Sequence, residues 1–395
     1  MRVLIAHNYY TQRGGEDVVF EEEANLLEQQ GHDVVRFSRR SDEIETSGVA
    51  LAINTLWNRK SGFEIAQAIE KNQIELVHFH NIFPVLSPSV FVAARRSGAV
   101  VVKSIHNFRM LCPKAVFYRD GAVCFDCRAK VLKGPAIRHA CYRESRRATA
   151  VAAAMSATHR WLRTYRTSVD AFIAPSHYAK AQYEESGYPM GPIYVKPHFI
   201  EQDLGVAPGA GDFAMYVGRL SEEKGIRTLL QASQSVPHIP FKIVGSGPLE
   251  HLMTSLPRHI AWLGSLSSAD VYGLMGEAAC VIVPSDCGET FGRVIVEAFS
   301  RGTPVICSAH GAQAELVAPH VGQQFVPGDA GGLAKAMSEF FAVGRNTQSM
   351  RQAARNEYLR HYSASANYER LIEIYTLARG HRNHATTDGH HNELG

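Results

Sequence analysis

Two glutamates eight residues apart, Glu289 and Glu297, are the side chains of this sequence best suited to bind a polar ligand. An apolar run, residues 280–283, ends at a proline, a polar turn follows, and a helical pattern begins at Val294. This pattern predicts that Glu289 lies in a loop after a buried strand and that Glu297 lies about one turn inside the next helix. Carboxylates fixed in such places accept hydrogen bonds from sugar and ribose hydroxyls. We therefore expect a ligand crevice at the end of this strand, where open α/β sheets bind their ligands.

Two cations, Arg219 and Lys224, follow another apolar run, residues 213–217, and precede a helical pattern that begins near Ile226. Both therefore stand at the end of a predicted strand and beside the N-terminus of a helix. Paired cations in this position suit a diphosphate whose negative charge grows as a glycosidic bond breaks. The alternative interpretation is a pair of solvated surface charges.

The first half of the chain offers weaker candidates after its own predicted strands. Gly14 and Gly15 precede a helical pattern at residues 18–30, and adjacent glycines let the backbone approach an anion at a helix N-terminus. Their spacing is not G-x-G-x-x-G, which argues against a dinucleotide-dependent dehydrogenase. His106 closes the predicted strand 100–105, where it could hydrogen-bond a sugar hydroxyl or a phosphate, or simply be a structural polar residue.

Composition limits the class of protein. The chain has 395 residues, of which 45% are hydrophobic and 20% are charged, as in ordinary globular enzymes of two or three domains. The net charge of +3 is too small to predict nucleic-acid binding through a basic field. Neither a signal peptide nor an apolar stretch of about 18 residues is present, so we expect a cytoplasmic protein without disulfides among its seven cysteines.

Short apolar strands alternate with longer helical patterns along nearly the whole chain, and these elements position the candidate residues. Such alternation is typical of parallel βαβ architecture. A Pro/Gly-rich stretch, residues 196–212, separates two similar halves, and two open sheets facing each other would enclose a cleft suited to a small molecule. The predicted strands are residues 3–6, 33–37, 76–80, 100–105 and 171–174 in the first half, and 213–217, 241–244, 260–263, 280–283, 304–307 and 322–326 in the second.

We expect four parts in order along the chain. Residues 1–200 form a first parallel-sheet domain, which carries a cysteine-rich loop at 107–145. Residues 201–355 form a second parallel-sheet domain. A C-terminal helix over 356–379, the main part of a helical pattern that begins near residue 349, packs back on the first domain. A polar tail at 380–395 is disordered.

The ordered series of motifs resembles the retaining glycosyltransferases of family 4, also known as glycosyl transferases group 1. The resemblance covers most of residues 1–378 and is strongest over 213–330. It implies a GT-B fold of two doubly wound, Rossmann-like domains, in which the first domain, residues 1–200, would bind the acceptor and the second, residues 201–355, would bind the nucleotide sugar. The motifs that carry it are residues 217–220 with 224–225, 244–249, 284–285, 289–297 and 302–306.

This resemblance also implies roles for individual residues. Arg219 and Lys224 would bind the donor diphosphate, Glu297 the nucleotide ribose, and Glu289 would lie beside the transferred sugar. Transfer would retain the anomeric configuration by front-face attack, and the two cations would replace a divalent ion, so that no bound metal is required for catalysis. The further donor-site positions that the resemblance implies are Gly15, His106, Gly245, Phe291, Gly292 and Arg293. The run 310–315 differs from the Gly-Gly-x-x-Glu of many members.

The cysteine-rich loop contains a separate set of candidate metal ligands. Their spacing, C-x11-C-x2-C-x13-C, includes a Cys-x-x-Cys core that suits one tetrahedral structural zinc. Reduced or buried free thiols and a redox site are the alternatives that the spacing leaves open. The four residues are Cys112, Cys124, Cys127 and Cys141.

Arginines that follow this loop are interleaved with apolar positions, as in a basic amphipathic helix that binds anionic lipid headgroups. The alternative is a solvated helix face. This pattern predicts a protein that is cytoplasmic and associates peripherally with the inner face of the cell membrane. The arginines are Arg138, Arg143, Arg146, Arg147, Arg160, Arg163 and Arg166.

Together these features predict an enzyme that moves a hexosyl group from a nucleotide-diphosphate sugar to an acceptor hydroxyl. The resemblance favours a lipid-linked or polysaccharide-precursor acceptor in bacterial cell-surface glycan synthesis. A nucleotide-sugar hydrolase or epimerase of the same fold is one alternative. A catalytically silent scaffold that binds sugar nucleotides is another, although Arg219, Lys224, Glu289 and Glu297 are all present.

Overall fold

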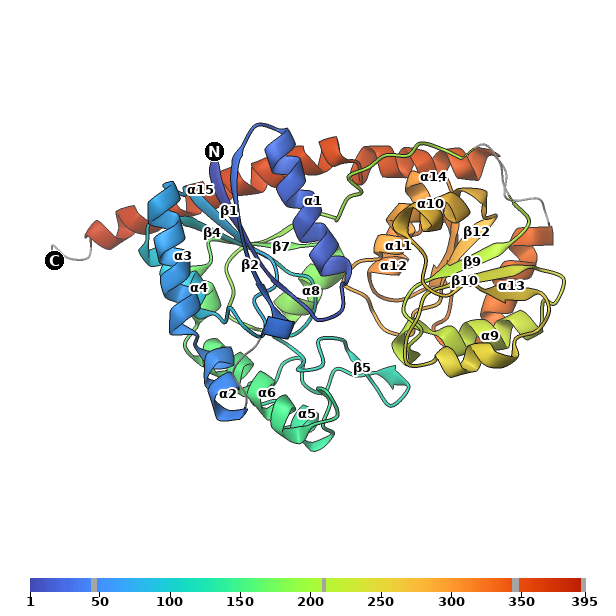
Figure 1. Cartoon of the computed structure of the whole chain (residues 1–395), viewed down its shortest axis with the longest axis horizontal. Coiled ribbons are helices and arrows are strands. Elements are labelled where there is room, and N and C mark those ends of the chain that lie inside the picture. Colours follow the sequence, from blue (N-terminus) through green and yellow to red (C-terminus); the bar gives the residue numbers. More distant parts are fainter. Residues whose placement is uncertain (44–47, 208–210, 343–347, 392–395) are drawn as a thin grey trace. The chain divides into compact units, whose positions relative to one another are not determined.

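The computed structural model describes residues 1–43, 48–207, 211–342 and 348–391 (Figure 1). The chain divides into two compact units, each built around its own sheet. Unit 1 consists of Met1–Val116, Phe125–Pro197 and Asn367–Gly395, and unit 2 of Phe117–Cys124 and His198–Ala366. The first unit is therefore completed by residues from the C-terminal end of the chain.

Unit 1 contains a six-stranded parallel sheet of order β2-β1-β3-β4-β7-β8. All the strands predicted for the first half are present. A sixth, β8, was missed because it is a three-residue edge strand whose side chains are only half-buried. The strands are β1 (Arg2–Tyr9), β2 (Asp33–Arg40), β3 (Leu76–Phe79), β4 (Val100–Ser104), β7 (Ala171–Ala174) and β8 (Ile193–Val195).

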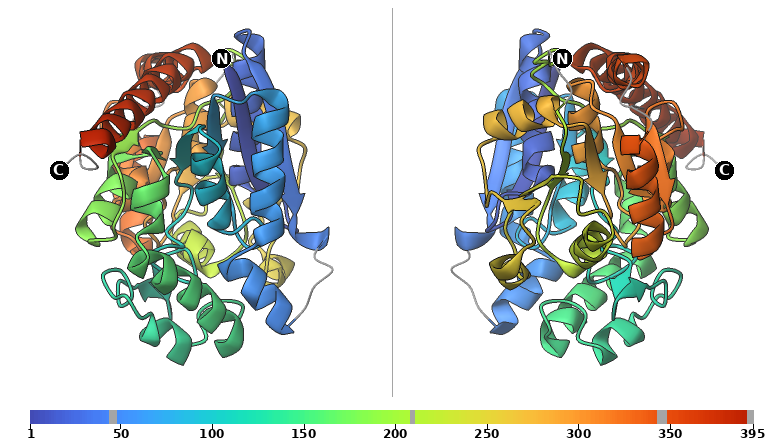
Figure 2. Two further views of the ribbon diagram at one scale, coloured as in Figure 1. Left: turned by 90° about the vertical axis from the view of Figure 1, so that its left-hand side faces the viewer. Right: turned by 90° about the vertical axis from the view of Figure 1, so that its right-hand side faces the viewer.

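Helices cover both faces of this sheet (Figure 2). The helices before the last are α1 (Gly15–Gln29), α2 (Gly48–Leu56), α3 (Arg59–Asn72), α4 (Ser89–Arg96), α5 (Gly134–Arg138), α6 (Arg146–Trp161), α7 (Thr164–Ser168) and α8 (His177–Glu185). On one face Val3 and Val102 pack with Leu27 of α1 and with Leu371 and Ile374 of the C-terminal helix. On the other, α4 presents Phe91 to Phe79, with ring centroids 5.0 Å apart.

Unit 2 repeats this architecture with a six-stranded parallel sheet of order β11-β10-β9-β12-β13-β14. Each strand agrees with its predicted range to within one residue at either end. The strands are β9 (Ala214–Val217), β10 (Phe241–Val244), β11 (Ile260–Trp262), β12 (Cys280–Val283), β13 (Val305–Ser308) and β14 (Gly322–Phe325). The helices are α9 (Ile226–Gln234), α10 (Ser268–Glu277), α11 (Arg293–Ser300), α12 (Gly311–Leu316), α13 (Ala330–Ala342) and α14 (Gln348–His361).

Two apolar layers sandwich this second sheet. Leu229 of α9 and Met337 of α13 pack against one face, on Tyr216 and its neighbours. Phe299 of α11 and Tyr358 of α14 pack against the other. The inner strands β12 and β13 are buried on both sides, which explains why they read as continuous apolar runs in the sequence.

A small antiparallel hairpin, β5 (Tyr118–Arg119) and β6 (Ala122–Val123), belongs to unit 2 although it lies in the first half of the chain. Its turn residues Asp120 and Gly121 have φ of 52° and 79°, the left-handed pair that a tight hairpin requires. The sequence analysis treated this stretch only as part of a loop.

The expectation of one continuous C-terminal helix is wrong, because the structure has two. After α14 the chain interrupts its helix at Tyr362 and Ser363, where Ile200 forms an isolated bridge to Ser363. The backbone N–H of Ile200 donates to the carbonyl of Tyr362 at 3.3 Å. A new helix, α15 (Ala364–His391), then begins, so helical backbone continues beyond Arg379, and residues 392–395 lie outside the described residues.

Candidate functional site

Two glycine-rich loops lie against each other at the carboxyl ends of β9 and β10. The N–H of Gly218 donates to Val244 at 3.0 Å, and that of Leu220 donates to Ser246 at 2.9 Å. Gly245 has φ of 134°, and a Cβ on it would lie only 1.9 Å from the Gly218 carbonyl oxygen. Only glycine fits there, so this motif position fixes the spacing of the two loops.

A third loop, after β12, joins them through a second glycine. Gly225 has φ of 69°, and a Cβ on it would lie 1.8 Å from the carbonyl oxygen of Pro284. The N–H of Asp286 also donates to the carbonyl of Glu223 at 3.0 Å. These contacts bring Lys224, at the N-terminus of α9, next to the loop that carries Glu289.

Lys224 and Glu289 form an ion pair in which Nζ lies 2.9 Å from Oε1, with side chains 33% and 19% exposed. The Ser285 hydroxyl donates to the same Oε1. Burial opposes the charge on Lys224, but the Glu289 carboxylate outweighs it and raises the pKa of Lys224 above its usual range. Since both contacts use Oε1, the carboxylate is held in one orientation and Oε2 remains to accept a ligand's hydroxyl.

Gln313 of α12 hydrogen-bonds the backbone of the loop that carries Glu289. The sequence analysis did not single out this residue. Its fully buried amide donates from Nε2 to the carbonyls of Ser285, at 3.2 Å, and Cys287, at 3.3 Å. Its Oε1 accepts from the N–H of Glu289 at 3.4 Å. The only sequence signal for it was that it lies in the run 310–315, which departs from the family pattern.

Arg219 is exposed beside the Lys224–Glu289 pair and makes no ion pair with any described carboxylate. The buried hydroxyl of Tyr216 donates to the Arg219 carbonyl at 2.9 Å, and burial raises the pKa of Tyr216. The backbone of Arg219 is therefore fixed while its guanidinium stays accessible to an anion.

Glu297 lies on α11 and pairs with Arg293, whose Nε is 2.9 Å from its Oε1. Both are residues predicted for the donor site, and both side chains are mostly buried. Gly292 is the N-cap of this helix, and Phe291 before it is buried against His198, with ring centroids 4.9 Å apart. The helix begins one residue earlier than predicted.

The hairpin β5–β6 also reaches this part of unit 2. Tyr118 is 6% exposed, and its pKa is raised to about 12, first by burial and then by the carboxylates of Asp286, Glu222 and Glu223. No residue pattern in the cysteine-rich loop indicated this position.

In unit 1 the predicted Gly15 is the first residue of α1, next to the N-cap Gly14. A Cβ on either glycine would meet nothing within 4 Å, so the space in front of this helix is open. Asp17, in the first turn, accepts from the N–H of Gly14 at 2.8 Å, which fixes the turn.

His106 lies two residues after β4, in a small cavity of about 40 Å³ that has room for a water molecule. Lys103 and Arg109 also line it, and burial lowers the pKa of Lys103 to about 8. Glu16 lines the same cavity and was not among our candidates; the Asn107 amide donates to its Oε1 at 2.6 Å.

Cys127 and Cys141, two of the other cysteines of the predicted zinc site, lie near enough to Cys112 to contribute to the raised pKa of its thiol. Among the described residues, the only group of three His, Cys, Asp or Glu side chains whose nitrogen, sulfur or carboxylate oxygen atoms lie within 4.8 Å of one another is Glu23, His78 and His80, so no three of the four cysteines meet this criterion. The Cys112 thiol instead donates to the carbonyl of Val116 at 3.3 Å, and burial raises its pKa to about 11. None of the seven cysteines is in a disulfide, and the zinc hypothesis stays a prediction.

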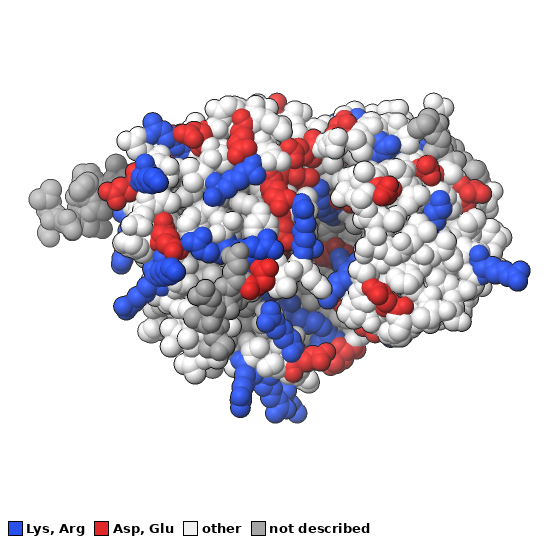
Figure 3. All heavy atoms as spheres, in the orientation of Figure 1, with Lys and Arg blue, Asp and Glu red and all other residues white. Residues whose placement is uncertain are grey.

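The expectation of one basic amphipathic helix also needs correction, because the arginines are spread over α5, α6, α7 and the turns between them. Arg160 is only half-exposed; its guanidinium lies 5.4 Å from the ring centroid of Tyr188 and donates to the carbonyl of Gly187. The other six are exposed and pair with no described carboxylate: Arg138, Arg143, Arg146, Arg147, Arg163 and Arg166. Basic side chains gather over this part of unit 1 (Figure 3).

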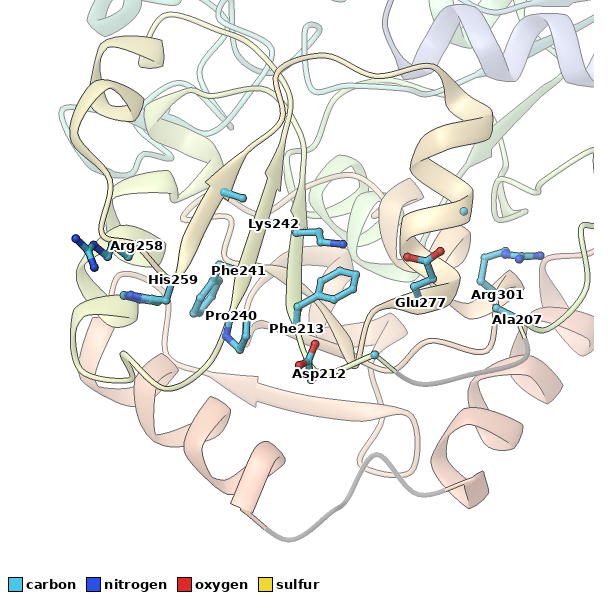
Figure 4. Close-up of a pocket in the computed structure, with 13 residues that line it drawn as sticks. Ala207, Asp212, Phe213, Pro240, Phe241, Lys242, Arg258, His259, Glu277 and Arg301 are labelled. Carbon is cyan, nitrogen blue, oxygen red and sulfur yellow. The ribbon is translucent and has the colours of Figure 1, made fainter.

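A cavity of about 850 Å³ lies at the opposite, amino-terminal edge of the unit 2 sheet (Figure 4). Phe213, Phe241 and Arg258 line it, and the Lys242 ammonium lies 3.8 Å from the centre of the Phe213 ring. It is lined by none of the predicted site residues.

Two family models match consecutive parts of the chain. The model for Glycosyltransferase Family 4 matches residues 13–204, and the model for Glycosyl transferases group 1 matches residues 205–357. Among the described residues, no helix combines the length and apolar character that a membrane crossing requires.

Curated relatives match over part of the chain. The phosphatidyl-myo-inositol mannosyltransferase of Mycobacterium leprae is 32% identical over 42% of this chain and 47% of its own length. The putative teichuronic acid biosynthesis glycosyltransferase TuaC of Bacillus subtilis is 33% identical over 32% of each. The chain therefore spans about half or less of the length of the curated relatives it matches.

Solved structures match over nearly the whole chain. Sucrose-phosphate synthase from Thermosynechococcus elongatus has a TM-score of 0.70 at 19% identity and covers 95% of this chain and 98% of its own. The Anabaena protein HepE in complex with UDP has a TM-score of 0.67 at 18% identity and covers 95% and 100%. These likenesses confirm the predicted GT-B fold class of two parallel-sheet α/β units.

Proposed function

We propose, for a chain that belongs to glycosyltransferase family 4, that it transfers a glycosyl group from a nucleotide-diphosphate sugar to an acceptor hydroxyl with retention of configuration. One observation carries the proposal: Lys224 is held against Glu289 beside the exposed Arg219, where three loops converge at the carboxyl ends of β9, β10 and β12. This edge of a parallel α/β sheet is the general place for ligand binding.

Arg219 and Lys224 bind the diphosphate and neutralise the charge that develops on it as the glycosidic bond breaks. Lys224 is the cation that Glu289 keeps protonated, and Arg219 is the cation that no described carboxylate occupies. In this proposal the two cations do the work of a divalent ion. Solved structures of HepE with UDP and with UDP-glucose support a nucleotide-diphosphate donor.

Glu289 and Glu297 bind hydroxyl groups at the two ends of the donor. Oε2 of Glu289 accepts from the transferred sugar, while Ser285 and Lys224 hold its Oε1. Glu297, on the same side of α11 as Arg293, accepts from the nucleotide ribose. The acceptor oxygen then attacks on the face that the diphosphate leaves, and a leaving phosphate oxygen takes its proton.

Turnover of single-site variants tests this proposal. Arg219→Ala and Lys224→Ala should each lower turnover by about two to three orders of magnitude, the usual loss when a charge-stabilising group is removed. Arg227→Ala is the matched control, because Arg227 is a nearby exposed cation that pairs with Glu222. Normal turnover in both site variants would place the diphosphate elsewhere.

The assay should follow nucleotide release from a panel of donors, with and without acceptor extract. Release that needs no acceptor would favour the hydrolase alternative, and conversion of the sugar without release would favour the epimerase. Nucleotide-sugar binding with neither reaction would identify a silent scaffold. Only acceptor-dependent release supports transfer.

We also propose a lipid-linked acceptor reached at an anionic membrane surface. The six exposed arginines of the α5–α7 region have no described carboxylate partners, and large apolar side chains are exposed among them. Trp161 is 80% exposed and Leu132 is 77% exposed, while α2, which packs on α6, exposes Val49 at 76%. Cations beside exposed apolar side chains suit the interface of an anionic bilayer.

Co-sedimentation with vesicles that contain an anionic phospholipid tests this surface. The double variant Arg146→Glu/Arg147→Glu and the variant Trp161→Ala should both reduce the bound fraction, the first one most strongly at low salt. Arg258→Glu/Lys335→Glu, an equal change of charge on exposed side chains of unit 2, is the control. Equal loss in control and test variants would reduce the effect to net charge alone.

A further inference from the structure

His106 stands at the end of a row of buried polar side chains in unit 1 that the proposed reaction does not use. Nδ1 of His80 lies 3.0 Å from Nε2 of His106, and Nε2 of His80 lies 3.3 Å from Oε2 of Glu23. The Lys196 ammonium donates to the other oxygen, Oε1, of Glu23. Glu23, His80 and Lys196 are at most 1% exposed, so no bulk water joins this row.

The charge state of each member follows from its neighbours. Burial opposes ionisation of Glu23, but Lys196 and His80 outweigh it and hold the pKa of Glu23 well below its usual range. Burial lowers the pKa of His80 to about 4, although Glu23 acts in the opposite direction. At neutral pH, Glu23 is therefore a carboxylate and His80 is neutral, with a single ring proton.

That proton belongs on Nε2 of His80. If it were on Nδ1, the lone pair of Nε2 would face the Glu23 carboxylate at 3.3 Å in a buried place, which is unfavourable. No other described group hydrogen-bonds this Nε2. With the proton on Nε2, Nδ1 carries the lone pair, so the nitrogen 3.0 Å away, Nε2 of His106, must be the donor.

The surrounding titratable groups do not compete for these nitrogens. His7 pairs with Asp17 at 2.7 Å, and the Lys103 ammonium donates to backbone carbonyls, including that of His80. His78 is also 3.5 Å from Glu23, but its shorter contacts are to the hydroxyls of Tyr375, at 2.9 Å, and Ser104, at 2.8 Å. The row from Glu23 through His80 to Nε2 of His106 is therefore a continuous series of buried polar contacts.

We propose that Glu23 and His80 are positioning residues that hold His106 as the neutral tautomer with its single ring proton on Nε2, so that any hydrogen bond made by Nδ1 of His106 is one that it accepts. Resting on the proposed function, this assigns Nδ1 of His106 to a hydroxyl group of a substrate, which can donate a hydrogen bond, and not to a phosphate oxygen, which cannot. His106 then orients that hydroxyl-bearing substrate.

The tautomer can be observed directly, without any activity assay. Two-bond ¹H–¹⁵N spectra of the full chain, labelled in histidine and recorded at neutral pH, separate a protonated ring nitrogen from a bare one. The signals of His106 are those lost in His106→Gln. We expect Nε2 at the shift of a protonated nitrogen and Nδ1 at the shift of a bare one. The opposite assignment overturns the proposal, whether or not the chain is a transferase.

Variants of His80 test the positioning role. His80→Asn can place an amide oxygen near the position of Nδ1 of His80, so it should preserve the His106 signals. His80→Leu offers no acceptor, so His106 should become a mixture of its two tautomers. We expect this variant to lower kcat about tenfold, the effect of losing one well-placed hydrogen bond. His78→Leu is the control, since His78 is equally buried beside Glu23 but does not contact His106.

Three outcomes decide the matter. If His78→Leu shifts the His106 signals as much as His80→Leu does, the effect of His80 comes from general packing and not from its hydrogen bond to His106. If His80→Leu does not fold, the wild-type spectrum and His80→Asn still decide the tautomer. A wild-type spectrum as expected, together with no donor turnover at all, would retain the tautomer and reject the transferase proposal instead.

Discussion

Replacing the buried amide of Gln313 tests whether the Glu289 loop is held as the structure indicates. Gln313→Met keeps a long unbranched side chain but removes two donated hydrogen bonds and one accepted hydrogen bond. The amide of Gln313 is 0% exposed. Without it, three backbone groups lose their hydrogen-bond partner in a place that water does not reach: the carbonyls of Ser285 and Cys287 and the N–H of Glu289. Each polar group left unsatisfied in a buried place costs about 1–3 kcal/mol, and the contacts here are long, so we expect a loss of about 2–4 kcal/mol in the free energy of unfolding.

The chain offers a matched control. Gln324 also donates from one amide nitrogen to two carbonyls, those of Ala314 at 2.9 Å and Val317 at 2.7 Å, but its side chain is exposed. Water can replace an exposed amide, so Gln324→Met should cost less than about 1 kcal/mol. Comparing the stability losses of the two variants therefore separates the effect of burying the amide from the effect of the number and length of its hydrogen bonds.

Chemical denaturation followed by circular dichroism measures the stabilities, and steady-state kinetics with the donor reports the loop. Gln313→Met should raise the donor KM, because the loop that orients Glu289 and Ser285 becomes mobile, while Gln324→Met should leave KM unchanged. Equal stability losses in the two variants, or an unaltered donor KM in Gln313→Met, would refute this account of the loop.

Other predictions concern single groups. Glu289→Gln keeps the hydrogen-bonding shape but removes the charge, so it should lower the pKa of Lys224 and reduce turnover by more than tenfold, with a stability change of no more than about 1 kcal/mol because the pair is partly exposed. Glu297→Ala should chiefly weaken binding of free nucleotide; calorimetry that finds unchanged affinity would contradict the ribose role. The folded pKa of Lys103, about 8, lies below its usual value of 10.5. The unfolded chain therefore binds more protons between these pH values, and the Lys103 contribution to stability should rise with pH across that window. Lys103→Met should flatten this rise in denaturation experiments at pH 8 and pH 10.

Much of the fold was predictable because buried parallel strands are short, continuous apolar runs. Cys280–Val283 and Phe241–Val244 were predicted at their observed bounds for this reason. Elements that depend on little apolar signal were missed. The half-buried edge strand Ile193–Val195 and the hairpin at Tyr118 have too few residues to show a period.

Helix breaks to which distant contacts contribute were also missed. The local signal for the break after α14 is weak: Ser363, whose hydroxyl accepts from the N–H of Ala366 at 3.4 Å as an N-cap does, while the bridge from distant Ile200 also interrupts the helix there. The cysteine spacing was locally suitable for zinc, yet a metal site depends on where four side chains meet in space. Spacing alone could not establish that.

The sequence alone determined the family, the two-sheet class and the residue types at the strand ends, because the motifs with their glycines, cations and carboxylates are local in the chain and their spacing can be read directly. Tertiary structure decided how those residues are held. It brought Gln313 behind the Glu289 loop and linked His106 through His80 to Glu23, residues 26 and 83 positions earlier in the chain. Such partners depend on which buried groups face one another after folding, and a buried polar group must be satisfied by whatever the packed chain places beside it.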